Sequence, residues 1–189
     1  MKIAKLGLIL FAITVVAAGI LGFANEKTAV LIEKVNEDAN NESRQQVLPE
    51  ADEFKELESN KLKEIQTSNP EVLDIYEGIK GGEVIGYTIK TGTNGYGGIV
   101  EVITGINKEE KIIEGVRLGN NNETPGLGAL ATEESFYGQY DKKPSEELEV
   151  VKSAPGETDI LAITGATITS KAVTSGVNLA SEVFAELDK

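Results

Sequence analysis

The pattern of hydrophobic and polar positions changes twice along the chain. Leu6–Ala24 is an uncharged and largely apolar run, close to the ~20 residues that a membrane-spanning helix needs. Glu26 to about Pro70 is polar and charged. From Gly81 onward, apolar and polar residues alternate as they do in strands. The pattern predicts a membrane anchor over residues 1–25, a charged helical segment over 26–78 and a folded domain over 79–189.

The apolar run allows two interpretations, a retained anchor or a cleaved signal peptide. Gly22-Phe23-Ala24 offers a small-x-small cleavage site, but the run is longer than a usual signal core of roughly 7–15 residues, which favours the anchor. Lys2 and Lys5 precede the run. In either case basic residues stay on the cytoplasmic side, so we expect a single-pass protein of the cell membrane with most of the chain outside the cytoplasm.

The charged segment after the apolar run carries apolar residues at loose helical spacing. We expect two helices joined near Val47-Leu48-Pro49, although a solvated charged stalk is an alternative for the first half. The residues that set the spacing are Val30, Leu31, Val35, Phe54, Leu57, Leu62 and Ile65.

The C-terminal region predicts an α+β fold, an antiparallel sheet with packed helices. Alternation predicts strands in residues 82–91, 97–107, 111–119 and 148–153, the second and third forming a hairpin. A Gly/Pro/Asn-rich loop then leads into a short helix that Thr132 would cap, and residues 153–159 read as a turn. Apolar residues three and four apart predict one amphipathic helix from Thr169 or Ser170 to the end.

Composition excludes several classes of function. The net charge of -13 argues against nucleic acid, whose binding needs clustered Lys and Arg. The chain has no Cys and no His, which excludes thiol catalysis, disulfides, Cys/His zinc sites and a Ser-His triad. Its chemistry must therefore use hydroxyls, carboxylates, lysines, backbone amides or an added cofactor.

Small hydroxyl residues gather in the stretch "ITGATITS", residues 163–170, just before the last helix. Thr167 would lie two or three residues ahead of that helix, with Thr169 or Ser170 as its cap. A helix N-terminus favours bound phosphate, and Gly165 and Ala166 allow close approach to the backbone. The stretch predicts either a phosphate site or an ordinary capped helix start.

Two glycine-rich stretches are the other candidates for ligand contact. In "ETPGLG", residues 123–128, Pro125-Gly126 suits the centre of a type II turn. This turn could be an ordinary surface turn, or it could lay Leu127 against a flat ligand. In "NGYGG", residues 94–98, Tyr96 could stack on an aromatic ligand or fill the core, and the ease with which Tyr packs favours the core.

Together, "GYGG", "ETPGLG" and "TGATITSKAV" resemble the G subunit of the Rnf electron-transport complex. They resemble, more distantly, the C subunit of the sodium-pumping NADH:quinone reductase. The resemblance implies FMN held by a phosphoester bond to Thr167, which a separate flavin transferase would form from FAD. It implies further contacts with the cofactor from Thr124, Gly126, Leu127, Gly128, Thr164, Gly165, Ala166 and Thr169.

The resemblance also implies a function, an electron carrier within a membrane complex that couples electron transfer between ferredoxin and NAD to ion translocation. The expected partners are the other subunits of that complex, the transferase and the membrane. In one place the chain departs from the family pattern: Leu161 stands where an Asp usually lies six residues before the modified threonine, and Asp159 is the nearest carboxylate. The alternative function is an anchored ligand-binding or sensory module without a redox role.

Overall fold

The computed structural model describes residues 2–188, with the side chains of residues 2, 30 and 33 left out. It divides the chain into two compact units, residues 1–40 and 41–189. Helix α1 spans Lys2–Val47, so its last two turns belong to the second unit.

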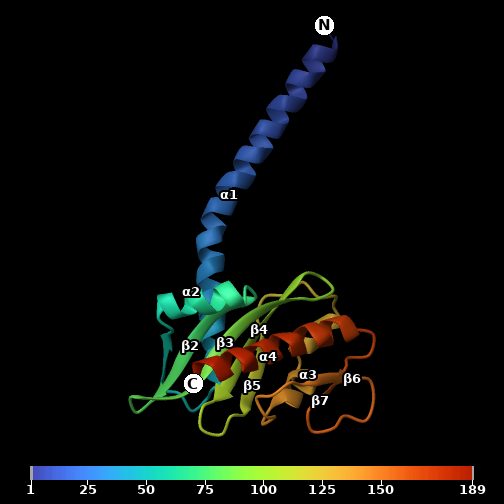
Figure 1. Ribbon diagram of the computed structural model, residues 1–189. Coiled ribbons are helices and arrows are strands. Elements are labelled where there is room, and N and C mark those ends of the chain that lie inside the picture. Colours follow the sequence, from blue (N-terminus) through green and yellow to red (C-terminus); the bar gives the residue numbers. More distant parts are fainter. Residues whose placement is uncertain (1, 189) are drawn as a thin grey trace. The chain divides into compact units, whose positions relative to one another are not determined.

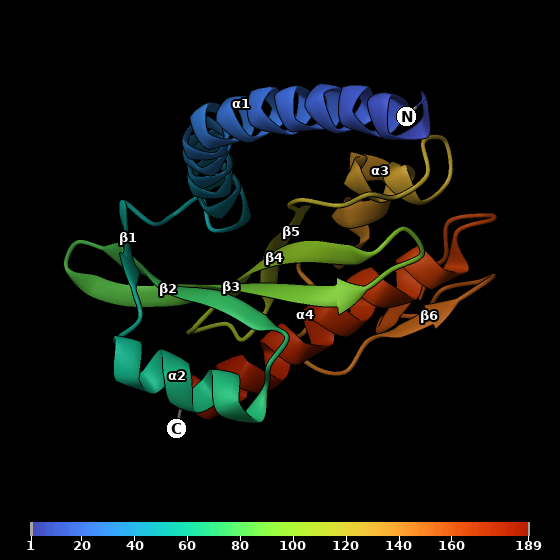
Figure 2. The same ribbon diagram turned by 90° about the horizontal axis from the view of Figure 1, so that it is seen from above.

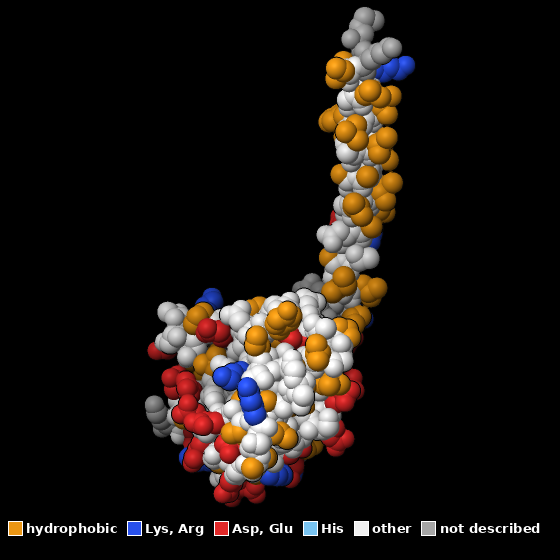
Figure 3. Space-filling model, turned by 90° about the vertical axis from the view of Figure 1, so that its right-hand side faces the viewer, with side chains coloured by type: hydrophobic (Ala, Val, Ile, Leu, Met, Phe, Trp, Pro, Cys, Tyr) orange, Lys and Arg blue, Asp and Glu red, His pale blue; other side chains and the backbone are white. Residues whose placement is uncertain are grey.

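Within the first unit, α1 has the length and composition to cross a membrane, and it is the one such helix among the described residues. Its apolar side chains, including Leu8 and Phe11, are exposed rather than packed in a core, and Figure 3 shows hydrophobic side chains along the visible face. A signal sequence would meet the same criteria of length and composition.

The second unit is built on a five-stranded antiparallel sheet in the order β1-β2-β3-β4-β5 (Figure 1). A short parallel pair, β6 and β7, stands apart from it. The elements in chain order are β1 (Glu53–Glu56), α2 (Ser59–Ser68), β2 (Val72–Lys80), β3 (Glu83–Asn94), β4 (Ile99–Asn107), β5 (Ile113–Leu118), the 3-10 turn η1 (Gly128–Thr132), α3 (Glu134–Tyr137), the 3-10 turn η2 (Gly138–Tyr140), β6 (Glu149–Val151), β7 (Asp159–Leu161) and α4 (Thr167–Leu187).

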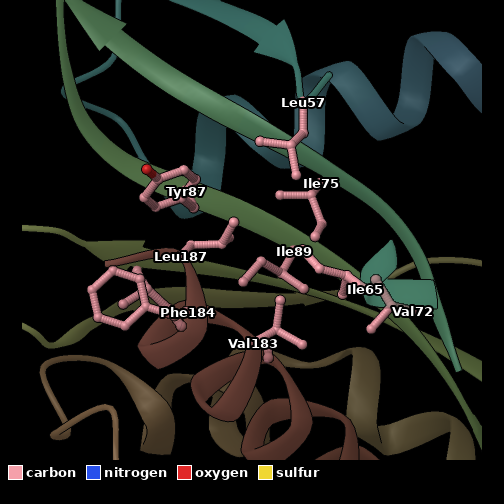
Figure 4. Packing of buried hydrophobic residues seen from close by; sticks show 11 residues of the cluster. Leu57, Ile65, Val72, Ile75, Tyr87, Ile89, Val183, Phe184 and Leu187 are labelled. Atoms are coloured by element: carbon pink, nitrogen blue, oxygen red, sulfur yellow. The ribbon is translucent and has the colours of Figure 1, made fainter. Parts of the chain in front are cut away.

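Helix α4 runs along one face of the sheet, as Figure 2 shows. Its buried residues recur every three to four positions and form one face of the helix. On this face, Val183, Phe184 and Leu187 pack with Ile75 and Ile89 of the sheet (Figure 4). Two buried hydroxyls also hold the helix to β3: Thr91 donates to the carbonyl of Gly176 at 3.2 Å, and Thr93 donates to the carbonyl of Ala172 at 2.8 Å. The N-terminal end of α4 is thereby fixed to the end of β3.

The predicted α+β architecture is confirmed, including the strands β3, β4, β5 and β6 and the long C-terminal helix. The expectation of helical structure over residues 26–78 is only partly right. One helix continues from the apolar run to Val47, α2 follows later, and strands β1 and β2 occupy residues predicted as helix.

Strand β2 was missed because its buried positions do not alternate. Val72, Ile75 and Gly78 are the buried residues, each three apart, a spacing that resembles one face of a helix. Two register shifts in the pairing with β3, between Val72 and Asp74 and between Gly78 and Ile79, explain the spacing. An irregular strand bends and changes which side chains face the core.

One smaller expectation is corrected near α3, and one short strand, β7, was not predicted. Thr132 does not cap α3: the residue at the cap position is Glu133, and the Thr132 hydroxyl donates instead to the carbonyl of Ala129 at 2.8 Å. The predicted turn is confirmed over residues 153–158. Its last predicted residue, Asp159, instead begins β7, which pairs in parallel with β6. A strand of three residues is too short to show alternation.

Candidate functional site

The turn before α4 leads directly into the first turn of that helix, whose amides have no acceptor within the helix. Gly165 adopts a φ of 80°, and α4 begins at Thr167, two or three residues earlier than predicted. The first intrahelical bond runs from the amide of Ser170 to the carbonyl of Ala166 at 3.0 Å. The amides of Thr167, Ile168 and Thr169 therefore have no acceptor within the helix, which leaves them free to face an anion.

The predicted capping by Thr169 or Ser170 is wrong. The cap position is Ala166, whose methyl side chain has no oxygen to accept a hydrogen bond from the helix amides. The Thr169 hydroxyl donates to a carboxylate oxygen of Glu123 at 2.7 Å. The Ser170 hydroxyl accepts from the amide of Ile163 at 3.0 Å and lies 3.0 Å from the carbonyl of Ala166. Because the helix begins before both residues, they lie inside its first turn, and their hydroxyls bind the partners named above in place of capping the helix.

The stretch 123–128 forms the predicted β-turn. The amide of Leu127 donates to the carbonyl of Thr124 at 3.1 Å, and Gly126, at the third position, has a φ of 75°. A type II turn requires this positive φ and favours Pro before it. The turn leaves the Leu127 side chain 44% exposed, available to a ligand.

Tyr96 lies in the loop between β3 and β4 and does not belong to the core. Its side chain is 71% exposed, so the favoured interpretation of a core tyrosine is wrong. The loop closes through the amide of Gly95, which donates to the carbonyl of Gly98 at 2.8 Å. With its backbone turned back on itself, the loop presents the Tyr96 ring outward.

These three segments, far apart in sequence, line one pocket of about 510 Å³. This volume lies within the ~300–1,000 Å³ of small-molecule sites. Of the predicted contact residues, Thr164 and Gly126 lie outside the lining. The residues that line the pocket are Tyr96, Glu123, Thr124, Leu127, Gly128, Gly165, Ala166, Thr167, Ile168 and Thr169.

Glu123 is a pocket residue to which sequence reasoning gave no role. It is buried, with 7% of its surface exposed. One carboxylate oxygen accepts from the amides of Tyr96 at 2.9 Å and Gly97 at 3.0 Å, and the other accepts from Thr169. Burial acts to raise the pKa of Glu123, but the hydrogen bonds from Thr169, Gly97 and Tyr96 together outweigh it and lower the pKa below its ordinary value. The carboxylate is therefore ionised at neutral pH.

The lining suits a flat aromatic molecule that carries a phosphate. Tyr96, Leu127 and Ile168 present exposed apolar surface, and the glycines at 128 and 165 leave their side of the pocket without side chains. Glu123 is the one charged side chain among the described lining residues. The positive end of α4 is thus the feature of this lining that attracts an anion, and an FMN molecule has both the ring and the phosphate that these features fit.

Leu161, where an aspartate was expected, lies at the end of β7 and is 39% exposed. Its backbone exchanges hydrogen bonds with the side chain of Gln139, the amide donating at 2.8 Å and the carbonyl accepting at 3.3 Å. Asp159 accepts a hydrogen bond from the amide of Gly156 at 2.8 Å. Neither side chain lines the pocket.

Fold and pocket together define the class of protein, one with an FMN-binding domain. The family model of the FMN-binding domain matches residues 95–182, a range that contains every residue lining the pocket. Two solved structures share the fold. The C subunit of the Na⁺-translocating NADH-quinone reductase of Parabacteroides distasonis matches with a TM-score of 0.58 and 21% identity, over 80% of this chain and 94% of its own. NqrC of Shewanella oneidensis matches with a TM-score of 0.51 and 16% identity, over 61% and 60%.

Sequence relatives identify the family more narrowly. The G subunit of the Na⁺-translocating ferredoxin:NAD⁺ oxidoreductase complex of Acetobacterium woodii is 47% identical, over 98% of this chain and 93% of its own length. The G subunit of the ion-translocating oxidoreductase complex of Methanosarcina acetivorans is 31% identical, over 95% and 93%. The chain belongs to the family of G subunits of ion-translocating oxidoreductase complexes.

Proposed function

We propose that the protein carries electrons on an FMN attached covalently to Thr167, as a component of a membrane complex that couples electron transfer between ferredoxin and NAD to ion translocation. The observation that carries the proposal is the place of Thr167. It is the first residue of α4, it lines the pocket with the loop 123–128, and it ends the Thr-Gly-Ala-Thr motif of residues 164–167.

Attachment needs a hydroxyl that a second protein can reach, and Thr167 is partly exposed. A flavin transferase would supply FAD. The Thr167 oxygen forms a bond to the FMN phosphorus, the bond from that phosphorus to the AMP oxygen breaks, AMP leaves, and the transferase accepts the hydroxyl proton. The chain needs no base of its own for this step.

The start of α4 orients the phosphate but does not retain it. A helix N-terminus stabilises an exposed anion by about 0.3–1 kcal/mol, which is too little to hold a cofactor that can diffuse away. The covalent bond would provide the retention, and the free amides of Thr167, Ile168 and Thr169 would fix the direction of the phosphate. Tyr96, Leu127 and Ile168 would then contact the ring system at the mouth of the pocket.

When bound, FMN supplies the redox chemistry, while the protein binds and orients it. This division explains how a chain without Cys or His can serve in electron transfer. Helix α1 would anchor the protein in the cell membrane, with the second unit outside the cytoplasm because Lys2 and Lys5 precede the apolar run.

In-gel fluorescence of the denatured protein, co-expressed with a flavin transferase, tests the proposal. The wild type should fluoresce, and Thr167→Ala should not, because Ala has no oxygen to esterify. Thr164→Ala is the matched control: Thr164 is exposed, belongs to the same motif and lies outside the pocket lining, so this variant should stay fluorescent. A dark wild type would instead favour the ligand-binding module without a redox role.

A further inference from the structure

The carboxylate of Glu123 joins the three segments that form the pocket. It belongs to the loop 123–128, it accepts two amide hydrogen bonds from the β3–β4 loop at Tyr96 and Gly97, and it accepts one from Thr169 in the first turn of α4. We infer that Glu123 is a positioning residue that assembles the pocket before the flavin arrives and holds Tyr96 against the flavin ring. The inference about the ring rests on the proposed function.

Two glycines, Gly128 and Gly95, leave the space that this carboxylate occupies. A Cβ atom at Gly128 would lie 2.3 Å from one carboxylate oxygen of Glu123 and 2.6 Å from the Thr169 hydroxyl oxygen. A Cβ atom at Gly95 would lie 2.3 Å from the other carboxylate oxygen. Any side chain at Gly128 or Gly95 would displace the carboxylate, so the three bonds depend on glycine on both sides.

A carboxylate suits this position because all three of its partners are donors. Ionised Glu has acceptors alone and no proton of its own to place, and the lowered pKa of Glu123 keeps it ionised at neutral pH. Gln can imitate most of this arrangement: its oxygen can accept from the two amides while its amide group donates to the Thr169 oxygen. Ala can form none of these hydrogen bonds. Comparing the Gln and Ala variants therefore separates the effect of the hydrogen bonds, which hold the loop, from the effect of the negative charge.

The consequence for the flavin concerns Tyr96. This residue lines the pocket, its backbone is held by Glu123, and its ring is largely exposed. A tyrosine in contact with a flavin ring quenches its fluorescence, because the phenol gives an electron to the excited flavin and takes it back without net reaction. Phe, which is harder to oxidise, packs in the same place but quenches far less.

The first arm of the test uses the full chain without flavin, in detergent, and measures hydrogen exchange of the Tyr96 and Gly97 amides. Glu123→Ala should speed their exchange by about tenfold or more, because hydrogen bonds to charged acceptors are the stronger ones. Gly128→Ala should act in the same direction, since it displaces the carboxylate without removing it. Glu123→Gln should stay within a few-fold of the wild type. This arm needs no cofactor, so its result is independent of the proposed function.

The second arm uses the flavinylated protein and measures the lifetime of flavin fluorescence. Tyr96→Phe should lengthen it severalfold, and Glu123→Ala should do the same, because the loop no longer holds the ring. Glu123→Gln should remain quenched, and so should Tyr137→Phe, a tyrosine of α3 outside the pocket lining.

Two results would overturn the inference. Amide exchange unchanged in both Glu123→Ala and Gly128→Ala would mean that the carboxylate does not hold the loop. A lifetime unchanged in Tyr96→Phe would remove Tyr96 from the ring. If Glu123→Ala fails to fold, Thr169→Val, which removes a single donor, provides the same comparison at lower risk and should lengthen the lifetime. An unmodified wild type would contradict the proposed function while leaving the exchange arm decisive.

Discussion

Arg44 in the last turn of α1 forms an ion pair with Asp74 on β2, with Nη2 and Oδ2 3.4 Å apart. Arg44 is 4% exposed, its guanidinium lies 3.7 Å from the centre of the Tyr76 ring, and it donates to Asn41 at 2.7 Å. Burial raises the pKa of Asp74 despite the neighbouring Arg44. The contact makes the end of α1 part of the sheet domain.

Arg44→Ala should therefore destabilise the second unit by about 3 kcal/mol, the low end of what breaking a buried pair costs, because Asp74 is partly exposed. Lys80→Ala is the matched control. Its pair with Glu50 is largely exposed and should be worth at most about 1 kcal/mol. Urea denaturation of both variants measures the difference, and equal losses would contradict the structural role given to Arg44.

Gly176 of α4 lies against Thr91 of β3 and Val102 of β4. A Cβ atom there would lie 2.7 Å from the Thr91 hydroxyl oxygen and 3.2 Å from Val102. Gly176→Ala should destabilise the domain by roughly 1–3 kcal/mol through overpacking. Gly138→Ala, whose Cβ would have ordinary contact with Glu134, should have little effect. A thermal melt that ranks the two variants in the opposite order would show that α4 can move off the sheet freely.

The lowered pKa of Glu123 predicts how stability depends on pH. A carboxylate whose pKa is lower when folded stabilises the fold above its ordinary pKa of 4.5, and this contribution is lost as pH falls through the folded value. Wild type should exceed Glu123→Gln in stability most clearly at pH 7, and the gap should narrow toward about pH 3. Denaturation curves at both pH values test this. A stability difference that widens in acid would contradict a lowered pKa of Glu123 in the folded protein.

Lys2 and Lys5 before the apolar run predict a cytoplasmic N-terminus and a second unit outside the cytoplasm. Protease added to right-side-out vesicles should digest residues 41–189, while a cytoplasmic marker protein inside the same vesicles survives. Protection of the domain until the membrane is lysed would place it on the cytoplasmic side.

Sequence patterns predicted the regular parts of the fold and most of the residues that line the pocket. Alternation located β3, β4 and β5 because their pairing is nearly regular. The resemblance grouped Thr167 with the loop 123–128, and the structure brings both into the lining of one pocket. Strand β2 escaped because of its irregular register.

The role of Glu123 could not be predicted from the sequence for another reason. Its donors are 26, 27 and 46 residues away in the chain, and no local pattern reports such contacts. The start of α4 was misplaced because Thr169 and Ser170 resemble caps in sequence but bind partners elsewhere.

The intact mass of the full-length protein, co-expressed with a flavin transferase, tests covalent attachment at Thr167 most directly. The wild type and Thr164→Ala should each gain the mass of one FMN less one water, and peptide mapping should place it on Thr167. Thr167→Ala should gain nothing, whereas Thr167→Ser, which keeps a hydroxyl, should gain it at least in part. A full gain of mass in Thr167→Ala would place the attachment on another residue and contradict the account.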